Sequence, residues 1–155
     1  MIIAIGSDHR GLKLKNSLFA WLESQGHDVR DLGTASAEST DYADYAFEVA
    51  GHVGRGDAGL GILICGTGIG MSIAANKVKG VRAARVCTER DAEMSKRHNN
   101  SNVLCFGADT GVSEELARKM IGAWIGAKFE GERHARRVGK ITDFEKSRGK
   151  INAVD

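Results

Sequence analysis

Residues 59–72 read Gly59-Leu60-Gly61-Ile62-Leu63-Ile64-Cys65-Gly66-Thr67-Gly68-Ile69-Gly70-Met71-Ser72, and this stretch decides the fold. No polar residue alternates with the apolar residues 60–64, which is typical of a strand in the centre of a parallel sheet with helices on both faces. A thiol and three glycines spaced two apart come next, and the residues after them can form a helix. The stretch therefore predicts a strand, a tight loop and a helix, with Cys65 at the carboxyl end of the strand.

The glycine loop has the backbone chemistry of an anion site. Gly66, Gly68 and Gly70 allow a tight turn and bring N–H groups close to a ligand, and the following helix directs its positive end at the same place. The loop can therefore cradle a phosphate or stabilise an enediolate. Many strand-to-helix turns need glycine for steric reasons alone and bind nothing, and this alternative stays open. The loop lacks the Gly-Lys-Ser/Thr ending of nucleotide triphosphate loops, which argues against ATP or GTP.

The composition is that of an ordinary globular protein. The chain has 155 residues, of which 42% are hydrophobic and 27% charged, and its formal net charge is +2. We expect one domain over residues 1–148 and a tail at 149–155, and nothing in the composition demands nucleic acid as a partner. No apolar stretch approaches membrane-spanning length and no signal peptide precedes Ile2, so we expect a cytoplasmic protein without a membrane partner.

The three cysteines do not indicate a disulfide framework or a structural zinc site. Cys65, Cys87 and Cys105 are odd in number and lack the spacing of either kind of site. We expect Cys87 and Cys105 to be small buried hydrophobes.

Five strand-like runs alternate with helical segments along the chain. The strands are expected at residues 2–5, 27–32, 60–65, 81–87 and 102–107. The clearest helix carries the apolar residues Tyr42, Tyr45, Ala46, Val49, Ala50 and Val53, and a final amphipathic helix carries Val138, Ile141 and Phe144. This alternation predicts an α/β fold, namely a three-layer α/β/α sandwich with a five-stranded parallel Rossmann-like sheet.

Two polar loops are expected to meet beyond the carboxyl ends of the first and third strands. If the strand order is 2-1-3-4-5, it reverses between these two strands, and ligands bind at such a reversal. The loops Ser7–Arg10 and Cys65–Gly70 would then bring a thiol, a carboxylate, an imidazole and free backbone donors together, a set that suits proton transfer better than hydride transfer. No metal-binding pattern is present, and Asp31 is the only candidate for the acidic residue of a dinucleotide fold, so we expect neither metal nor cofactor.

Four motifs follow one another along the chain. They are Gly6-Ser7-Asp8-His9-Arg10-Gly11, Cys65-Gly66-Thr67-Gly68-Ile69-Gly70 with Ala74-Ala75-Asn76-Lys77, His98-Asn99-Asn100 with Asn102-Val103, and Phe129-Glu130-Gly131-Glu132-Arg133-His134 with Arg136-Arg137-Val138. In this order the sequence resembles the RpiB/LacAB family of sugar-phosphate isomerases, from about Ile2 to about Glu145. The resemblance implies a cofactor-free aldose–ketose isomerase that interconverts D-ribose 5-phosphate and D-ribulose 5-phosphate. It also implies a homodimer, or a tetramer of paired dimers, with active sites shared between subunits.

The resemblance also implies roles for individual residues. Cys65 is implied as the base that takes the proton from sugar C2, and His98 as the acid/base that opens the sugar ring. Thr67 and the loop amides are implied to stabilise the enediolate, the amides being those of Gly66, Gly68, Ile69 and Gly70. The other implied substrate contacts are Asp8 and His9 for the sugar hydroxyls, Asn99 for orienting the substrate or its histidine neighbour, and Arg133 and Arg137 for the phosphate.

From the residues alone, each of these side chains has a plainer interpretation. Cys65 can be a buried core thiol, His98 a polar residue at a helix end, and Asp8 a helix cap. Arg133 and Arg137 can belong to a solvated basic face. Because these two arginines are spaced i and i+4, both guanidiniums can also reach one phosphate dianion.

The chain departs from the family pattern at Asp109 and at Arg90, which stands where an aromatic residue is common in ribose-type members. Met71 stands where members without the loop cysteine have a glutamate base, so the cysteine form is implied. Asp109 stands where the family usually has an arginine that helps to bind phosphate, and Arg136, Arg85 and Arg90 are candidates to compensate. The alternative substrate is a six-carbon sugar phosphate such as allose 6-phosphate or galactose 6-phosphate. The alternative functions are a non-catalytic sensor of a phosphorylated metabolite and a thiol redox protein.

Overall fold

The core of the molecule is a parallel sheet with helices on both faces. The computed structural model describes residues 1–151, with side chains described through residue 147. The strands are β1 (Ile2–Ser7), β2 (Asp28–Asp31), β3 (Leu60–Cys65), β4 (Ala83–Arg85) and β5 (Val103–Gly107), and all four strand pairings are parallel. The predicted three-layer α/β fold with a five-stranded Rossmann-like sheet is confirmed.

The strand order is β2-β1-β3-β5-β4, so the expected order was wrong in its last two strands. β5 is buried along its whole length and pairs with β3 from Gly61↔Val103 to Cys65↔Gly107. β4 has three residues, none of them buried, and lies at the edge beside β5. The continuous apolar strand takes the central position because both of its faces are covered, and the short strand takes the edge. The reversal of strand order still falls between β1 and β3.

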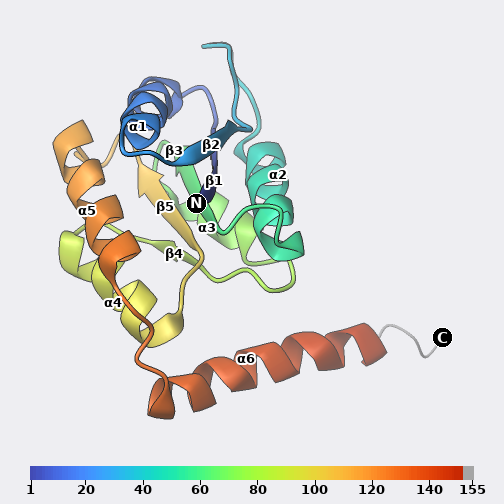
Figure 1. The fold of residues 1–155 in the computed structure, drawn as a ribbon. Helices are drawn as coiled ribbons and strands as arrows, with labels where there is room; N and C mark the ends of the chain where they lie inside the picture. Colours follow the sequence, from blue (N-terminus) through green and yellow to red (C-terminus); the bar gives the residue numbers. More distant parts are fainter. Residues whose placement is uncertain (152–155) are drawn as a thin grey trace.

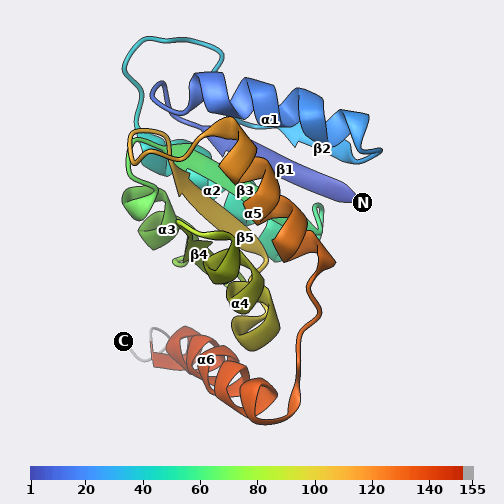
Figure 2. The same cartoon turned by 90° about the vertical axis from the view of Figure 1, so that its left-hand side faces the viewer.

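Within residues 1–151 there are six helices, of which the first five connect or cover the strands and the sixth follows them. They are α1 (Leu12–Ser24), α2 (Tyr42–Arg55), α3 (Ile69–Ala75), α4 (Glu89–Asn99), α5 (Glu114–Gly126) and α6 (Glu132–Ile151). α1, α4 and α5 cover one face of the sheet and α2 and α3 cover the other (Figure 1, Figure 2). Each face has its own apolar core, with Trp124 of α5 fully buried in one and Val49 of α2 in the other.

α3 begins at Ile69, directly after Gly68, whose left-handed φ of 73° ends the loop. One local expectation differs from the structure. β4 ends at Arg85, so Cys87 lies beyond the sheet edge and is exposed. The expected burial of Cys87 was therefore wrong, whereas that of Cys105 is confirmed. Burial strongly raises the pKa of the Cys105 thiol, which is the behaviour of an inert core cysteine.

The last helix stands apart from the rest of the chain. α6 follows an extended connection from α5 and lies below the sheet, beside the end of α4 (Figure 1, Figure 2). Its apolar residues Ile141 and Phe144 are 52% and 60% exposed. The helix runs through Ile151, so the segment 149–155 that was predicted as a tail begins as helix, and residues 152–155 lie outside the described part. No helix in residues 1–151 is both long and apolar enough to cross a bilayer.

Candidate functional site

The first polar loop, after β1, is tied to the end of β3. The Asp8 backbone N–H donates to the Ile64 carbonyl at 3.2 Å, so the loop sits against the strand that carries Cys65. The Asp8 side chain is 4% exposed, and its Oδ1 accepts the N–H groups of Arg10 at 3.0 Å and Gly11 at 3.1 Å. These contacts use one carboxylate oxygen to hold the loop, which leaves Oδ2 for a ligand. Asp8 therefore holds its own loop and is not the cap of α1, which is Gly11 and has no side-chain cap hydrogen bond, so the plain interpretation as a helix cap was wrong.

Cys65 lies at the carboxyl end of β3 and is 4% exposed. Its Sγ accepts the backbone N–H of Gly68 at 3.1 Å, so the loop folds back over the sulfur. Such a donor interacts more strongly with a negatively charged sulfur than with a neutral one. A Cβ at Gly68 would meet the Phe106 backbone at 2.8 Å, so this glycine is also required sterically. Thr67 is exposed at the tip of the loop, and its Oγ1 accepts the N–H of Ile69 at 3.3 Å.

His9, in the loop after β1, and Tyr42, the first residue of α2, complete this region. His9 Nδ1 accepts the backbone N–H of Thr40 at 3.1 Å, so the proton of the neutral ring is on Nε2, the nitrogen left for a ligand. Tyr42 is 45% exposed, so its expected place in the buried stripe of α2 was wrong. Its ring lies against Gly70, where an added Cβ would meet the ring at 2.5 Å. Sequence reasoning missed Tyr42 as a wall of the loop because its helical spacing matched the apolar pattern.

Asp109 also lies at this loop, and its charge is paired. Arg10 Nε donates to Asp109 Oδ2 at 2.5 Å, and the Asp109 N–H donates to the Gly66 carbonyl at 2.9 Å. The hydrogen bond to Asp109 raises the pKa of Arg10 above its ordinary value. The cation that offsets Asp109 is therefore Arg10, which was not among the expected candidates. Of those candidates, Arg85 donates to the Thr67 carbonyl at 2.7 Å and so supports the loop itself.

Asp31 has a structural partner. It accepts the buried Lys15 ammonium at 2.5 and 2.8 Å, and its Oδ1 also accepts the N–H of Gly33 at 3.0 Å. These contacts tie the end of β2 to α1 and give the residue a role other than that of a dinucleotide-binding acid.

The other predicted residues lie near the amino ends of the strands, which we call the amino edge of the sheet. The glycine loop lies at the carboxyl ends, which we call the carboxyl edge. α4 runs back from Thr88, near the carboxyl end of β4, and ends at Asn99, just before β5 begins. His98 and Asn99 are therefore at the amino edge, and the Glu130 N–H donates to the Arg97 carbonyl at 3.0 Å, which brings the start of α6 there as well. The register from Gly61↔Val103 to Cys65↔Gly107 spans four steps. At about 3.3 Å per residue, roughly 13 Å of sheet separates the two edges.

One chain thus divides the predicted site into two groups. Cys65, Thr67, Asp8 and His9 gather with the glycine loop at the carboxyl edge, and the second group gathers at the amino edge. The second group consists of His98, Asn99, Arg133 and Arg137. Both arginines are exposed in the first turns of α6, and neither has a carboxylate within ion-pair distance among residues 1–147.

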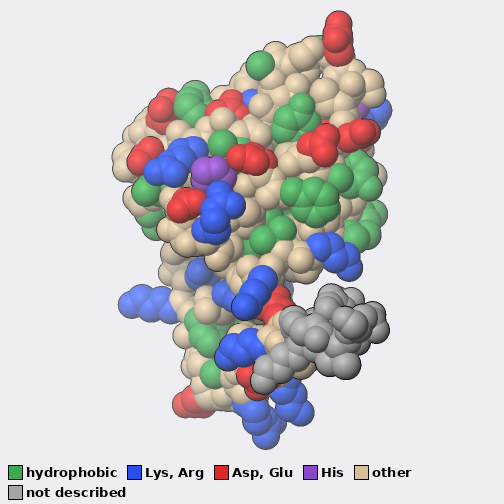
Figure 3. Space-filling view, turned by 90° about the vertical axis from the view of Figure 1, so that its right-hand side faces the viewer, with side chains coloured by type: hydrophobic (Ala, Val, Ile, Leu, Met, Phe, Trp, Pro, Cys, Tyr) green, Lys and Arg blue, Asp and Glu red, His purple; other side chains and the backbone are tan. Residues whose placement is uncertain are grey.

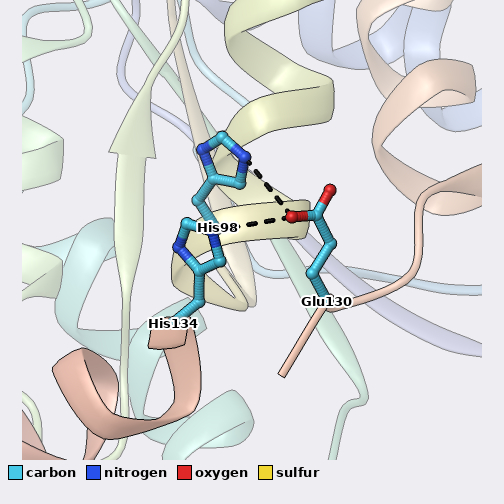
Figure 4. Close-up of side chains that lie close together, drawn as sticks. All are labelled: His98, Glu130 and His134. Atoms are coloured by element: carbon cyan, nitrogen blue, oxygen red, sulfur yellow. Dashed lines mark ion pairs between the residues drawn. The ribbon is translucent and has the colours of Figure 1, made fainter. Parts of the chain in front are cut away.

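Two further side chains, Glu130 and His134, complete a cluster with His98 (Figure 4). The imidazoles of His98 and His134 are stacked, with ring centroids 4.2 Å apart and ring planes 3° from parallel. Glu130 Oε2 lies 3.7 Å from His98 Nε2 and 3.5 Å from His134 Nε2. Burial lowers the pKa of His134, and the positive charges of His98 and Arg133 lower it further. Glu130 and His134 belong to the fourth sequence motif, but nothing in the sequence near them indicates that they meet His98, so no role was predicted for either.

The cluster has the residue types of a metal site, but its geometry does not suit an ion. The three ligand atoms lie within 4.8 Å of one another. Ligating lone pairs lie in the plane of an imidazole ring, and in two parallel stacked rings they cannot converge on one ion without rotation of a ring. The lone pair of His134 Nε2 also accepts the N–H of Arg133 Nε at 3.2 Å.

Comparisons with known proteins place the chain in a family. Residues 3–141 match the family model described as Ribose/Galactose Isomerase. Ribose-5-phosphate isomerase B of Escherichia coli is 50% identical over 147 residues, which cover 94% of this chain and 97% of that protein. The solved structure of Clostridium thermocellum ribose-5-phosphate isomerase B matches with a TM-score of 0.92 and 47% identity, over 95% of this chain and 99% of that one. The Mycoplasma genitalium ribose-5-phosphate isomerase B structure with bound ribulose-5-phosphate matches with a TM-score of 0.90 and 45% identity, over 94% and 96% of the two chains. The prediction of an isomerase is confirmed, and the chain belongs to the ribose/galactose isomerase family.

Proposed function

We propose that the protein interconverts D-ribose 5-phosphate and D-ribulose 5-phosphate through a cis-enediolate, with Cys65 as the base and no cofactor. The observation that carries the proposal is the contact of Cys65 Sγ with the Gly68 N–H, 3.1 Å apart, at the carboxyl end of the central strand. The sulfur is a nucleophilic atom that lies beside backbone donors, on the strand that is tied to the loop carrying Asp8 and His9. The Escherichia coli and Mycoplasma genitalium relatives, named for this sugar phosphate, support the choice of substrate.

The proposed isomerisation moves two protons. The Cys65 thiolate takes the hydrogen from C2, the electron pair forms the C1=C2 bond, and the aldehyde oxygen becomes an enediolate oxygen. The N–H groups of the glycine loop and the Thr67 hydroxyl stabilise that charge. The thiol then returns the proton to C1, the O2 proton is lost as C2 becomes the ketone, and O1 is protonated. The substrate and the product have the same atoms, so the reaction needs no redox partner.

Ring opening precedes this step, because D-ribose 5-phosphate exists mostly as a closed furanose. His98 delivers a proton to the ring oxygen as the C1–O4 bond breaks, and the C1 hydroxyl loses its proton to solvent, from which His98 is recharged. Arg133 and Arg137, spaced i and i+4 at the start of α6, bind the phosphate dianion. General acid–base help of this kind contributes about 10²–10⁴-fold.

We propose that the complete site needs two copies of the chain, as a homodimer or a tetramer of paired dimers. The carboxyl edge of one chain holds the thiol and the loop donors, whereas the amino edge holds His98 and the unpaired arginines. Exposed apolar side chains flank these parts: Tyr42 and Phe47 on α2, Ile69 and Ile73 on α3, and Ile141 and Phe144 on α6. The view onto the α2 side shows apolar side chains gathered there and the slender α6 lobe below (Figure 3). A second copy whose α6 covers this face would bury them and bring the two groups together.

The cysteine is tested by replacement with a matched control. Cys65→Ala should lower kcat by about 10²–10⁴-fold, whereas Cys87→Ala, at an exposed thiol beyond the sheet edge, should leave it unchanged. Exchange of the C2 hydrogen with solvent in the wild-type protein would exclude a mere metabolite sensor. Near-normal turnover of Cys65→Ala would remove Cys65 from the role of base. The six-carbon alternative is tested by comparing kcat/KM on ribose 5-phosphate, allose 6-phosphate and galactose 6-phosphate.

A further inference from the structure

We propose that Glu130 and His134 are positioning residues for ring opening: together they hold the His98 imidazole with Nε2 toward the Glu130 carboxylate and Nδ1 toward the sugar. This inference rests on the proposed role of His98. It assigns a task to a cluster that the proton-transfer step itself does not use.

Glu130 is fixed at one oxygen and free at the other. Its Oε1 accepts Arg97 Nε at 2.7 Å and Arg97 Nη2 at 2.6 Å, and Arg97 Nη1 is in turn held by Glu93 at 2.8 Å. The hydrogen bonds from Arg97 lower the pKa of Glu130, so the carboxylate is ionised. With Oε1 occupied, Oε2 is directed at the two imidazoles (Figure 4). The carboxylate thus presents one fixed negative charge to the ring of His98.

The His134 ring packs against one face of the His98 ring. It is 5% exposed, and its backbone N–H donates to the Gly131 carbonyl at 2.8 Å in the first turn of α6. Arg133 Nε donates to His134 Nε2, so the remaining proton is on Nδ1 and the ring is neutral. A neutral ring stacked 4.2 Å from His98 restricts its rotation without placing a like charge against the protonated form.

The two contacts together select one face and one nitrogen of His98. The stacked ring covers one face, and Glu130 stands at the Nε2 edge. This is the reverse of the Ser-His-Asp triad, in which the carboxylate holds Nδ1 and Nε2 faces the substrate. The His98 side chain is 37% exposed, so the opposite edge, with Nδ1, is open. The Nε2 to Oε2 distance of 3.7 Å is longer than a hydrogen bond, and catalytic contacts of this kind often shorten only when substrate binds.

The chain contains a matched pair for comparison. His52 and Glu48 on α2 are also spaced i and i+4, with Nε2 3.4 Å from Oε1, the same spacing as His134 and Glu130. No other histidine ring is stacked on His52 among the described residues. Variants at this pair therefore report what loss of a histidine–glutamate contact four residues apart does when no second imidazole is involved.

The test measures ring opening directly, in Cys65→Ala protein, where the proposed isomerisation is blocked. The α and β anomers of D-ribose 5-phosphate labelled with ¹³C at C1 exchange through the open aldehyde, and magnetisation-transfer NMR gives the exchange rate. We expect the protein to accelerate this exchange and His98→Gln to abolish the acceleration. His134→Ala and Glu130→Gln should each reduce it about tenfold, a part of the 10²–10⁴-fold that general acid–base help supplies. His134→Phe should retain most of it, and His52→Ala and Glu48→Gln all of it.

The outcomes separate the positioning roles of Glu130 and His134, the stacking contact and the role of Cys65. Full acceleration in His134→Ala and Glu130→Gln, with none in His98→Gln, would overturn the positioning roles. Loss in His134→Phe equal to that in His134→Ala would overturn stacking as the means. If the Cys65→Ala protein does not accelerate exchange at all, there is no ring opening to position and the inference is overturned. Continued isomerisation by Cys65→Ala would instead refute the cysteine base, and the exchange comparison would still decide the inference. Thermal unfolding of Glu130→Gln and His134→Phe identifies any variant whose loss reflects misfolding.

Discussion

Replacing Ile141 and Phe144 together by alanine removes the apolar stripe of α6, and its effect on assembly can be worked from the structure. The two side chains are 52% and 60% exposed in one chain. Full burial of such side chains contributes about 1.5–3 kcal/mol each, so covering the exposed portions contributes about 2–3 kcal/mol per copy. A two-fold dimer buries two such helices, which gives about 4–6 kcal/mol, or a rise of about 10³–10⁴-fold in the dimer dissociation constant.

The assay is sedimentation velocity over a dilution series, run in parallel with isomerase activity per chain at the same concentrations. Because the proposed site is divided between two copies, activity per chain should fall as the monomer fraction rises, and the double variant should lose it at higher concentration than the wild type. Lys119→Ala, at an exposed lysine on α5, serves as the control and should leave both curves unchanged. A double variant that is monomeric and fully active would refute both the shared site and the reasoning from α6.

Two further predictions concern charge. Arg10→Met leaves Asp109 unpaired beside the glycine loop, so the KM for a sugar phosphate should rise, whereas Asp109→Asn leaves Arg10 unopposed and should lower KM. At an exposed ion pair the expected change is about 1 kcal/mol, or roughly fivefold in KM, with kcat nearly constant. Equal KM values in the wild type and both variants would contradict a role for this pair near the phosphate. For His134, burial lowers its pKa from the ordinary 6.5, so the unfolded chain takes up this proton first as the pH falls. Its contribution to folding stability is therefore present above about pH 6.5 and lost as the pH falls toward its lowered pKa. In His134→Phe the midpoint of urea unfolding should therefore depend less on pH across that range. An unchanged pH slope in the variant would show that another group is responsible.

The structure confirms the predictions that depended only on neighbouring residues in the sequence. The segment from β3 to α3 was predictable because an uninterrupted apolar run and closely spaced glycines determine strand and loop within a few residues. The order of β4 and β5 was not predictable. It depends on which of the two segments forms the longer buried strand beside β3, and pairing between distant segments has no local signal in the sequence. The same limit applies to Arg10 and Asp109, which are 99 residues apart in the chain and form an ion pair at the glycine loop.

The direction of the parallel strands explains why one chain separates the residues of the proposed site. In a parallel sheet every strand ends at the same edge, so the loops that follow β1 and β3 share that edge, while a helix that returns along the sheet ends at the other. His98, at the last turn of α4, therefore cannot move to its own Cys65 by any local adjustment, since the whole length of the sheet lies between them. A chain that carries the thiol and the proposed ring-opening histidine on opposite edges can unite them only by pairing the carboxyl edge of one copy with the amino edge of another. The exposed stripe of α6 lies at that amino edge, so the contact that would assemble the dimer is the same contact that would deliver His98, Arg133 and Arg137 to the thiol.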